Sequence, residues 1–210
     1  MKHYNFKTEV SLNKDNYLTT CPIDGVTTKR KKINGKYTYE KFYKIDFYNI
    51  KKDYYIISSF GRIFSLISEK ELKQYSRKKD GYTALRLQTN DGSRIFPVHC
   101  LVARAFITKT FADNRLNRVY VHHKNWDNEY NYDWNLEWRS QYEISIMKSV
   151  QTKKEYLEED DLIKYTCKLL EVQTPIVDIF EILDKQISKD KISKILNKRL
   201  FTTISRDYNF

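Results

Sequence analysis

Residues Val121–Trp138 form the stretch that most constrains this chain, and they read VHHKNWDNEYNYDWNLEW. Two of the four histidines of the protein stand side by side there, as His122 and His123, and Asn, Asp and Trp residues follow them. Imidazole, carboxamide and carboxylate groups so close together are able to bind a divalent metal and activate a water molecule. A polar turn between two strands has the same composition, so the surrounding sequence has to decide between the two interpretations.

The distribution of charge indicates a polyanionic partner. The formal net charge is +11, and residues 151–210 contain 11 basic and 11 acidic side chains, which leaves 27 basic and 16 acidic side chains in residues 1–150. A basic chain rich in Tyr, Lys and Asn favours nucleic-acid binding. An AT-rich genome would favour the same residue types whatever the function.

Length and cysteine content predict a few small modules in a reducing compartment. At 210 residues and 40% hydrophobic content, the chain is able to form two or three packed modules. Cys21, Cys100 and Cys167 are too few and too widely spaced for a disulfide framework. No segment has the roughly 18 apolar residues of a membrane span, and the N-terminus lacks the apolar core of a secretory signal. We therefore expect a cytoplasmic protein with no membrane partner.

Residues 1–40 form an N-terminal segment to which the sequence assigns no role. Alternation at Tyr4–Phe6 and Glu9–Leu12 is typical of short strands. The basic run 29–32 leads to Asn34-Gly35, a strong hairpin-turn signal because both residues tolerate positive φ. The run is either a basic arm that follows phosphates or a solvated loop.

Residues 41–115 predict a small antiparallel sheet followed by a helix. β-rich segments at 54–59, 62–66, 82–87 and 94–98 are separated by turn signals at Gly61, Asp80-Gly81 and Asp91-Gly92. From residue 99 onward, apolar residues recur on one face of a helix. Outward basic side chains on such a sheet either contact DNA or are simply solvated. The candidates for DNA contact are Arg62, Arg77, Lys78, Lys79 and Arg86.

Residues 116–150 predict the order strand, loop, strand, helix. Residues 119–121 read as a strand that delivers the two histidines, and residues 134–138 read as the returning segment. Ser140 and Glu143 have the spacing of a capping box at the start of a helix.

Residues 151–210 predict a helical module. The pair Thr174-Pro175 predicts an N-cap followed by proline at the first helical position, and Ser188 is a candidate cap for the last helix. Residues 185–199 contain six basic side chains and one acidic one. This pattern is typical of a helix-turn-helix, although a generic three-helix domain would produce it too. The candidate DNA contacts are Lys189, Lys191, Lys194 and Arg199.

Taken in order, these segments resemble the phage-type HNH homing endonucleases. Residues 55–66 (YIISSFGRIFSL), Gly81-Tyr82 and 98–106 (VHCLVARAF) look like the modular DNA-binding segment that precedes the catalytic motif in that family, with Cys100 where Arg is usual. The resemblance implies an α+β fold with a small antiparallel N-terminal sheet, a ββα-metal (HNH) core and a C-terminal helix-turn-helix module. The sheet corresponds to residues 41–115, the ββα-metal core to 116–150 and the helix-turn-helix module to 151–210, while residues 1–40 remain a segment without an assigned role.

The resemblance also implies roles for residues of the central stretch. His123 would be the general base, Asn135 would pin the loop and orient that base, and His122 would bind the metal. One divalent ion is implied, Mg or Mn in the family, with Ni or Zn favoured by an imidazole ligand. The family's last ligand position, nine residues after Asn135, holds Ile144, which has no ligating atom. Its neighbour Glu143 would replace it only through a shift of helix register, because adjacent helical side chains point about 100° apart.

Two functions follow as expectations. The first is a monomeric HNH homing endonuclease that binds double-stranded DNA and hydrolyses a phosphodiester bond, in the cytoplasm of a bacterial host if it is phage-encoded. The second is a degenerate relative that acts as a sequence-specific DNA-binding protein or regulator. Two narrower alternatives stay open: a structural zinc site, and base stacking by aromatic side chains. The residues concerned are His99, Cys100, His122 and His123 for zinc, and Trp126, Trp134 and Trp138 for stacking.

Overall fold

The computed structural model describes residues 17–33, 35–152, 158–205 and 207–210. The described chain folds into two compact units. The first contains the residues up to Lys109 together with Val121–Trp138, and the second contains Thr110–Tyr120 together with the residues from Arg139 onward. The strands predicted at Tyr4–Phe6 and Glu9–Leu12 lie outside the described residues. No helix within those described ranges is long and apolar enough to cross a membrane.

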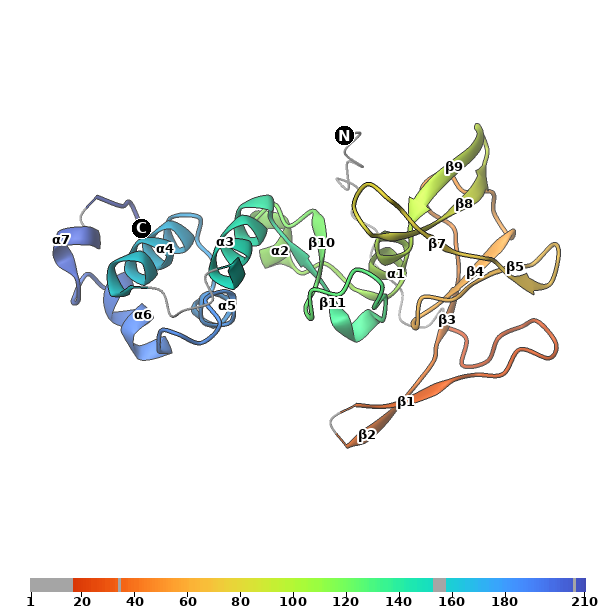
Figure 1. The fold of residues 1–210 in the computed structure, drawn as a ribbon, viewed down its shortest axis with the longest axis horizontal. Helices are drawn as coiled ribbons and strands as arrows, with labels where there is room; N and C mark the ends of the chain where they lie inside the picture. The colour runs from red at the N-terminus through yellow and green to blue at the C-terminus, as the bar shows by residue number, and fades with distance from the viewer. Residues whose placement is uncertain (1–16, 34, 153–157, 206) are drawn as a thin grey trace. The chain divides into compact units, whose positions relative to one another are not determined.

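The first unit consists mainly of short antiparallel strands (Figure 1). Their bounds are β1 Arg30–Ile33, β2 Lys36–Tyr39, β3 Phe42–Lys44, β4 Tyr55–Ser58, β5 Ile63–Ser65, β6 Lys70–Glu71, β7 Tyr75–Ser76, β8 Thr83–Thr89 and β9 Gly92–Pro97. The sheets have the orders β1-β2, β3-β4-β5-β6 and β7-β8-β9. A mixed α and β fold with small antiparallel sheets is therefore confirmed.

Turn chemistry explains the hairpins of this unit. Gly61 joins β4 to β5 at φ +80°, a conformation that favours glycine. In the β8–β9 hairpin, Thr89 pairs with Gly92, so Asn90 and Asp91 are the loop residues. The predicted turn at Asp91-Gly92 is thus displaced by one residue, because Gly92 takes the first position of the returning strand at φ +115°.

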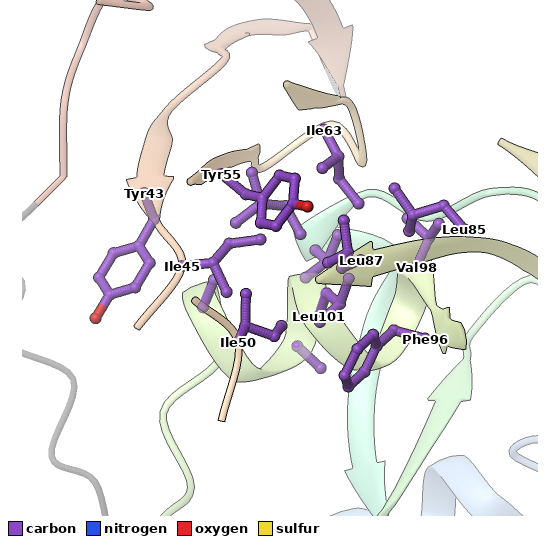
Figure 2. Packing of buried hydrophobic residues seen from close by; sticks show 14 of the residues in the cluster. Tyr43, Ile45, Ile50, Tyr55, Ile63, Leu85, Leu87, Phe96, Val98 and Leu101 are labelled. Atoms are coloured by element: carbon purple, nitrogen blue, oxygen red, sulfur yellow. The ribbon is translucent and has the colours of Figure 1, made fainter. Parts of the chain in front are cut away.

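The main core of this unit lies between the sheets and helix α1, Val98–Phe106. Figure 2 shows apolar side chains from β4, β5, β8 and β9 converging on Val98 and Leu101 of the helix. Leu101 and Val102 are fully buried, as the predicted helical face requires. α1 therefore belongs to the same core as Val121, Leu136 and Trp138 of the central stretch.

The central stretch forms a two-stranded antiparallel sheet with a long connecting loop. β10 spans Tyr120–His123, β11 spans Leu136–Arg139, and the 3-10 turn η2, Asp133–Asn135, leads directly into β11. The backbone N–H of Lys124 donates to the carbonyl oxygen of Asn135 at 2.8 Å, which closes the loop at its base. The predicted strand, loop and returning strand are confirmed.

The second unit is helical and has its own apolar core. Its helices are α2 Phe111–Arg115, α3 Gln141–Thr152, α4 Glu159–Glu171, α5 Ile176–Ile182, α6 Lys189–Leu196 and α7 Thr202–Ser205. Ser140 and Glu143 form the predicted capping box, with bonds of 3.2 and 2.8 Å between side chain and backbone. Ser188 caps α6 by accepting from the N–H of Lys191 at 3.2 Å.

Two helix starts in this unit differ from expectation. The sequence did not predict α2, whose N-cap Thr110 forms a capping box with Asp113. The prediction that Thr174 caps α5 is wrong, because Pro175 is itself the extended N-cap residue (φ −58°, ψ 143°) and the helix begins at Ile176.

Candidate functional site

Asn135 holds the loop of the central stretch in shape. Its Oδ1 accepts from the backbone N–H of Asn125 at 3.2 Å, and its Nδ2 donates to Asn125 Oδ1 and to the carbonyl oxygen of Tyr130, both at 2.8 Å. The side chain is buried, so these bonds are shielded from competition with water. One carboxamide thus joins both halves of the loop that follows His123.

The β4–β5 turn supports the same loop from outside. A Cβ atom on Gly61 would lie 2.9 Å from the carbonyl oxygen of Asn131, so only glycine permits this approach. The N–H of Asp133 donates to the carbonyl oxygen of Ser59 at 2.9 Å, and the Phe60 ring packs edge-on against Trp134. The predicted DNA-binding sheet and the histidine loop therefore form one rigid body within the first unit.

His123 is held as a neutral imidazole. Asn131 Nδ2 donates to the carbonyl oxygen of Glu129, so its Oδ1, 3.1 Å from His123 Nε2, is the atom that accepts from the imidazole. Nε2 therefore carries the hydrogen and Nδ1 carries the lone pair. Burial lowers the pKa of His123 below its ordinary value, although the bond to Asn131 opposes the shift. The imidazole is consequently neutral and able to take a proton near neutral pH.

His122 has the surroundings of a metal ligand. Its Nδ1 lies 3.2 Å from Glu137 Oε1, and its buried Nε2 has no hydrogen-bond partner among the described residues. A carboxylate on one ring nitrogen fixes the tautomer and leaves the other nitrogen to coordinate, as in many metal-binding histidines. The Trp126 ring packs edge-on against this imidazole, with ring centroids 4.6 Å apart, and limits its rotation. The donor chemistry at this position therefore fits one imidazole ligand for a divalent ion.

The remaining ligands of a metal site are not assembled from acidic, Cys or His side chains. Within the described ranges, no group of three or more such side chains is placed to hold a metal ion. On α3, Ile144 presents only hydrocarbon, and Glu143 is engaged elsewhere in its own unit. A metal at His122 would therefore depend on oxygen atoms from other groups, from substrate or from water.

Glu143 belongs to a buried ion cluster that centres on Arg118. Arg118 Nε donates to both carboxylate oxygens of Glu143 at 3.0 Å, and its Nη atoms reach Asp113 at 3.1 Å and Asp178 at 2.6 Å. Burial by itself would lower the pKa of Arg118, but the bonds to these carboxylates outweigh it and raise the pKa above its ordinary value. The Glu143 side chain is 1% exposed, so its carboxylate is committed to this cluster.

The structure argues against a zinc site at His99 and Cys100. Burial raises the pKa of the Cys100 thiol to about 12, which opposes formation of the thiolate that binds zinc. His99 instead packs its ring at 5.1 Å from that of His123 and at 4.4 Å from that of Tyr82. Burial, with smaller contributions from His123 and Arg77, lowers the pKa of His99 to about 3. His99 is thus a neutral side chain that packs against the ring of His123.

The three tryptophans divide between core and loop. Trp138 is 4% exposed and donates from Nε1 to the carbonyl oxygen of Ile107 at 3.0 Å, so it is a core residue and does not stack on bases. Trp134 stacks on Tyr132, with ring centroids 4.7 Å apart. Trp126 lies at φ +62° against His122, as part of the tight loop.

The basic residues of the first unit that were predicted to contact DNA differ in whether they are exposed or already paired with acidic side chains. Arg62 is bound on both sides of its guanidinium, by Glu40 and Glu71, and its side chain is 12% exposed. Arg77 pairs with Asp80. Lys78 and Lys79 are exposed between β7 and β8, and Arg86 is exposed on β8, where it donates to Ser93 at 3.2 Å.

The predicted DNA contacts of the second unit gather on and after α6. Lys189, Lys194 and Arg199 are exposed, and Lys191 is half-buried. Lys191 pairs with Glu159 at 2.6 Å and Lys194 with Asp190 at 2.7 Å. These are solvent-accessible pairs of the kind that phosphates are able to displace.

Sequence reasoning missed two residues that touch the histidines. It assigned the orientation of His123 to Asn135, whereas the direct contact comes from Asn131. It assigned no role to Glu137, the partner of His122. Glu137 had a detectable signal, since residues 120–123 and 136–139 are adjacent strands whose side chains meet across the sheet.

No protein-family model and no curated protein matches the sequence. Among solved structures, the chain is similar to one described as "DNA binding and cleavage by the HNH homing endonuclease I-HmuI", with a TM-score of 0.42 and 22% sequence identity, over 74% of this chain and 91% of that one. The site's own residues therefore carry the functional conclusion.

Proposed function

We propose that this protein is a metal-dependent endonuclease of the HNH homing type that hydrolyses a phosphodiester bond in double-stranded DNA. The observation that carries the proposal is the pairing of two unequal imidazoles. His123 has a lone pair at Nδ1 and a lowered pKa, and His122 has a buried Nε2 with no partner among the described residues. One ring suits proton transfer and the other suits metal binding.

The chain's own residues account for activation of the nucleophile. His123 Nδ1 takes a proton from a water molecule as its oxygen bonds to phosphorus, the bond from phosphorus to the 3′-oxygen breaks, and the departing 3′-oxygen takes a proton from solvent. Asn131 accepts from Nε2–H throughout, which stabilises the imidazolium that forms. Asn135 keeps the loop in the geometry that holds Asn131. A divalent ion held by His122 would stabilise negative charge on the phosphate and on the departing oxygen.

Charge and architecture support duplex DNA as the substrate. The excess of basic residues lies in residues 1–150, which include the sheets and the histidine loop. In the second unit, α5 and α6 are two short helices joined by a tight turn with Asp184 and Lys185 at positive φ. We assign them as a helix-turn-helix in which exposed basic residues of α6 face the major groove. A monomer with both modules would bind an extended site.

A nicking assay tests the proposal. Duplexes bound by the protein would first be selected from a random-sequence pool, and then incubated with protein in Mg²⁺, Mn²⁺ or Ni²⁺. His123→Ala should lower the single-turnover rate about 10²–10⁴-fold without weakening DNA binding, and added imidazole should restore part of it. His122→Ala should instead raise the metal concentration needed for half-maximal rate. Tight binding by the wild-type protein with no nicking in any metal would refute the proposal.

One observation favours a second candidate, a DNA-binding protein that no longer cleaves. Ile144 stands at the family's last ligand position, and the neighbouring carboxylate of Glu143 is bound by Arg118. A protein of this kind would bind its selected duplex with the salt dependence of phosphate contacts. It would show the same absence of nicking in the wild type and in His123→Ala.

A further inference from the structure

The β1–β2 hairpin carries an unusual concentration of positive charge. Residues 29–39 contain five basic side chains and no acidic one. In the antiparallel register, Arg30 lies opposite Tyr39 and Lys32 lies opposite Tyr37. Side chains two apart on a strand share a face, so these four residues form one side of the ribbon, which we call the basic-aromatic face.

The basic-aromatic face is open to solvent. Tyr37 and Tyr39 are 55% and 57% exposed, and both basic residues are exposed as well. The Arg30 guanidinium lies 4.7 Å from the Tyr37 ring centroid. In the part of the chain that the structure describes, no acidic side chain pairs with Arg30 or Lys32, whereas Arg62 of the same unit is neutralised by Glu40 and Glu71. An exposed face with this charge and no internal counterion suits a polyanion.

The hairpin is fixed at its base. The backbone N–H of Lys29 donates to Glu40 Oε2, and the N–H of Glu40 donates to the carbonyl oxygen of Lys29, both at 2.9 Å. Glu40 is 1% exposed and also binds Arg62. The strands therefore leave the sheet in a set direction.

The opposite side of the hairpin touches the histidine loop. Lys31 donates to the hydroxyl groups of Tyr130 and Tyr132, and its Nζ lies 3.9 Å from the ring centroid of Tyr132. Tyr132 follows Asn131, the partner of His123. The ribbon is thus attached to the loop that orients the candidate base.

We infer that the β1–β2 hairpin is a further DNA-binding element, which inserts its basic-aromatic face into the major groove beside the cleaved bond. The inference rests on the proposed function. A major groove about 12 Å wide admits a two-stranded ribbon, while the minor groove, about 6 Å wide, does not. Arg30 and Lys32 contact phosphates, and the hydroxyl groups of Tyr37 and Tyr39 donate to phosphate or base edges.

Salt-dependent binding tests the inference. The affinity of wild-type protein and of Arg30→Gln/Lys32→Gln for the selected duplex is measured between 50 and 200 mM salt by fluorescence anisotropy, without divalent metal. Loss of two phosphate contacts should lower the slope of log affinity against log salt by about 1.8. The control Lys51→Gln/Lys52→Gln removes the same charge from the loop before β4 and should leave the slope unchanged. Near-UV circular dichroism verifies that both variants keep the wild-type fold.

The outcomes separate this inference from the proposed function. A slope for Arg30→Gln/Lys32→Gln equal to that of the wild type overturns the hairpin inference, whether or not the protein nicks DNA. A lower slope together with absent nicking supports the hairpin as a DNA element and refutes the nuclease. A wild-type protein whose affinity does not fall with salt overturns both. Weaker binding by Tyr37→Phe/Tyr39→Phe at an unchanged slope would add that the hydroxyl groups make contacts of their own.

Discussion

Replacing Arg118 by methionine should destabilise the helical unit strongly. Glu143 would remain as a carboxylate that is 1% exposed and has lost its charged hydrogen-bond donor. Breaking a buried ion pair in this way costs about 3–5 kcal/mol. Arg139 Nη1, 3.6 Å from Glu143 Oε1, stays in place and compensates in part, which places the expected loss near 3 kcal/mol. Changing Glu143 to glutamine in the same chain should recover about 1–3 kcal/mol of this loss.

Tryptophan fluorescence and circular dichroism together show which unit Arg118→Met destabilises. All three tryptophans lie in the first unit, so their fluorescence follows that unit, while circular dichroism at 222 nm follows mainly α2 to α7 of the second. In urea titrations, Arg118→Met should shift the dichroism transition to lower urea. As a matched control, Lys194→Met breaks an exposed pair with Asp190 and should change the free energy of unfolding by less than about 1 kcal/mol. A shift for Arg118→Met no larger than that of the control would refute the assignment of Glu143 to a structural cluster.

Three further outcomes are expected. Asn131→Ala should lower the nicking rate by about tenfold or more with DNA affinity unchanged, because His123 loses the acceptor that sets its tautomer; equal rates would contradict that role. Since the folded-state pKa of His99 is about 3, the unfolded chain binds more protons at acidic pH, and between pH 6.5 and 5 the free energy of unfolding, measured by urea titration, should fall by about 1.6 kcal/mol more in metal-free wild type than in His99→Gln; an equal fall in both proteins would contradict this assignment. Glu137→Gln should raise the metal concentration for half-maximal nicking by about tenfold, because His122 loses the carboxylate that fixes its tautomer, while Glu129→Gln in the loop should not; equal metal requirements in both variants would contradict that role.

The sequence was sufficient for features that depend on a few consecutive residues. The capping box of Ser140 and Glu143 and the cap at Ser188 form as predicted, because donor and acceptor are three residues apart on one helix. The hairpin on either side of Gly35 also forms, with that residue at φ +82°. The error at Thr174 and the missed helix α2 concern single helical turns, where competing caps differ little in energy.

His122, His123 and Asn135 were singled out by their resemblance to the HNH motif, which lies within one continuous stretch of sequence. The tautomer of His123 and the hydrogen-bond partners of these side chains do not follow from the sequence. Which nitrogen of His123 holds the lone pair depends on Asn131, and the orientation of Asn131 depends on a bond to Glu129 within a folded loop. That loop is in turn supported by Gly61, which is distant in the sequence.

Whether a charged side chain is free to contact DNA likewise depends on the tertiary structure. Arg62 was predicted to contact DNA, but Glu40, 22 residues away, binds its guanidinium, and Arg118 binds Glu143 across 25 residues. The partner of a charged side chain is set only when folding brings distant segments together. A buried charged side chain then pairs within the protein, because an unpaired buried charge is costly, whereas an exposed one stays able to bind a ligand. The sequence alone thus determined the central motif, the turns and the excess of positive charge. Only the tertiary structure decided that His123 is held as a neutral imidazole, that Glu143 pairs with Arg118, and that Arg30 and Lys32 of the β1–β2 hairpin stay exposed with no acidic partner among the described residues.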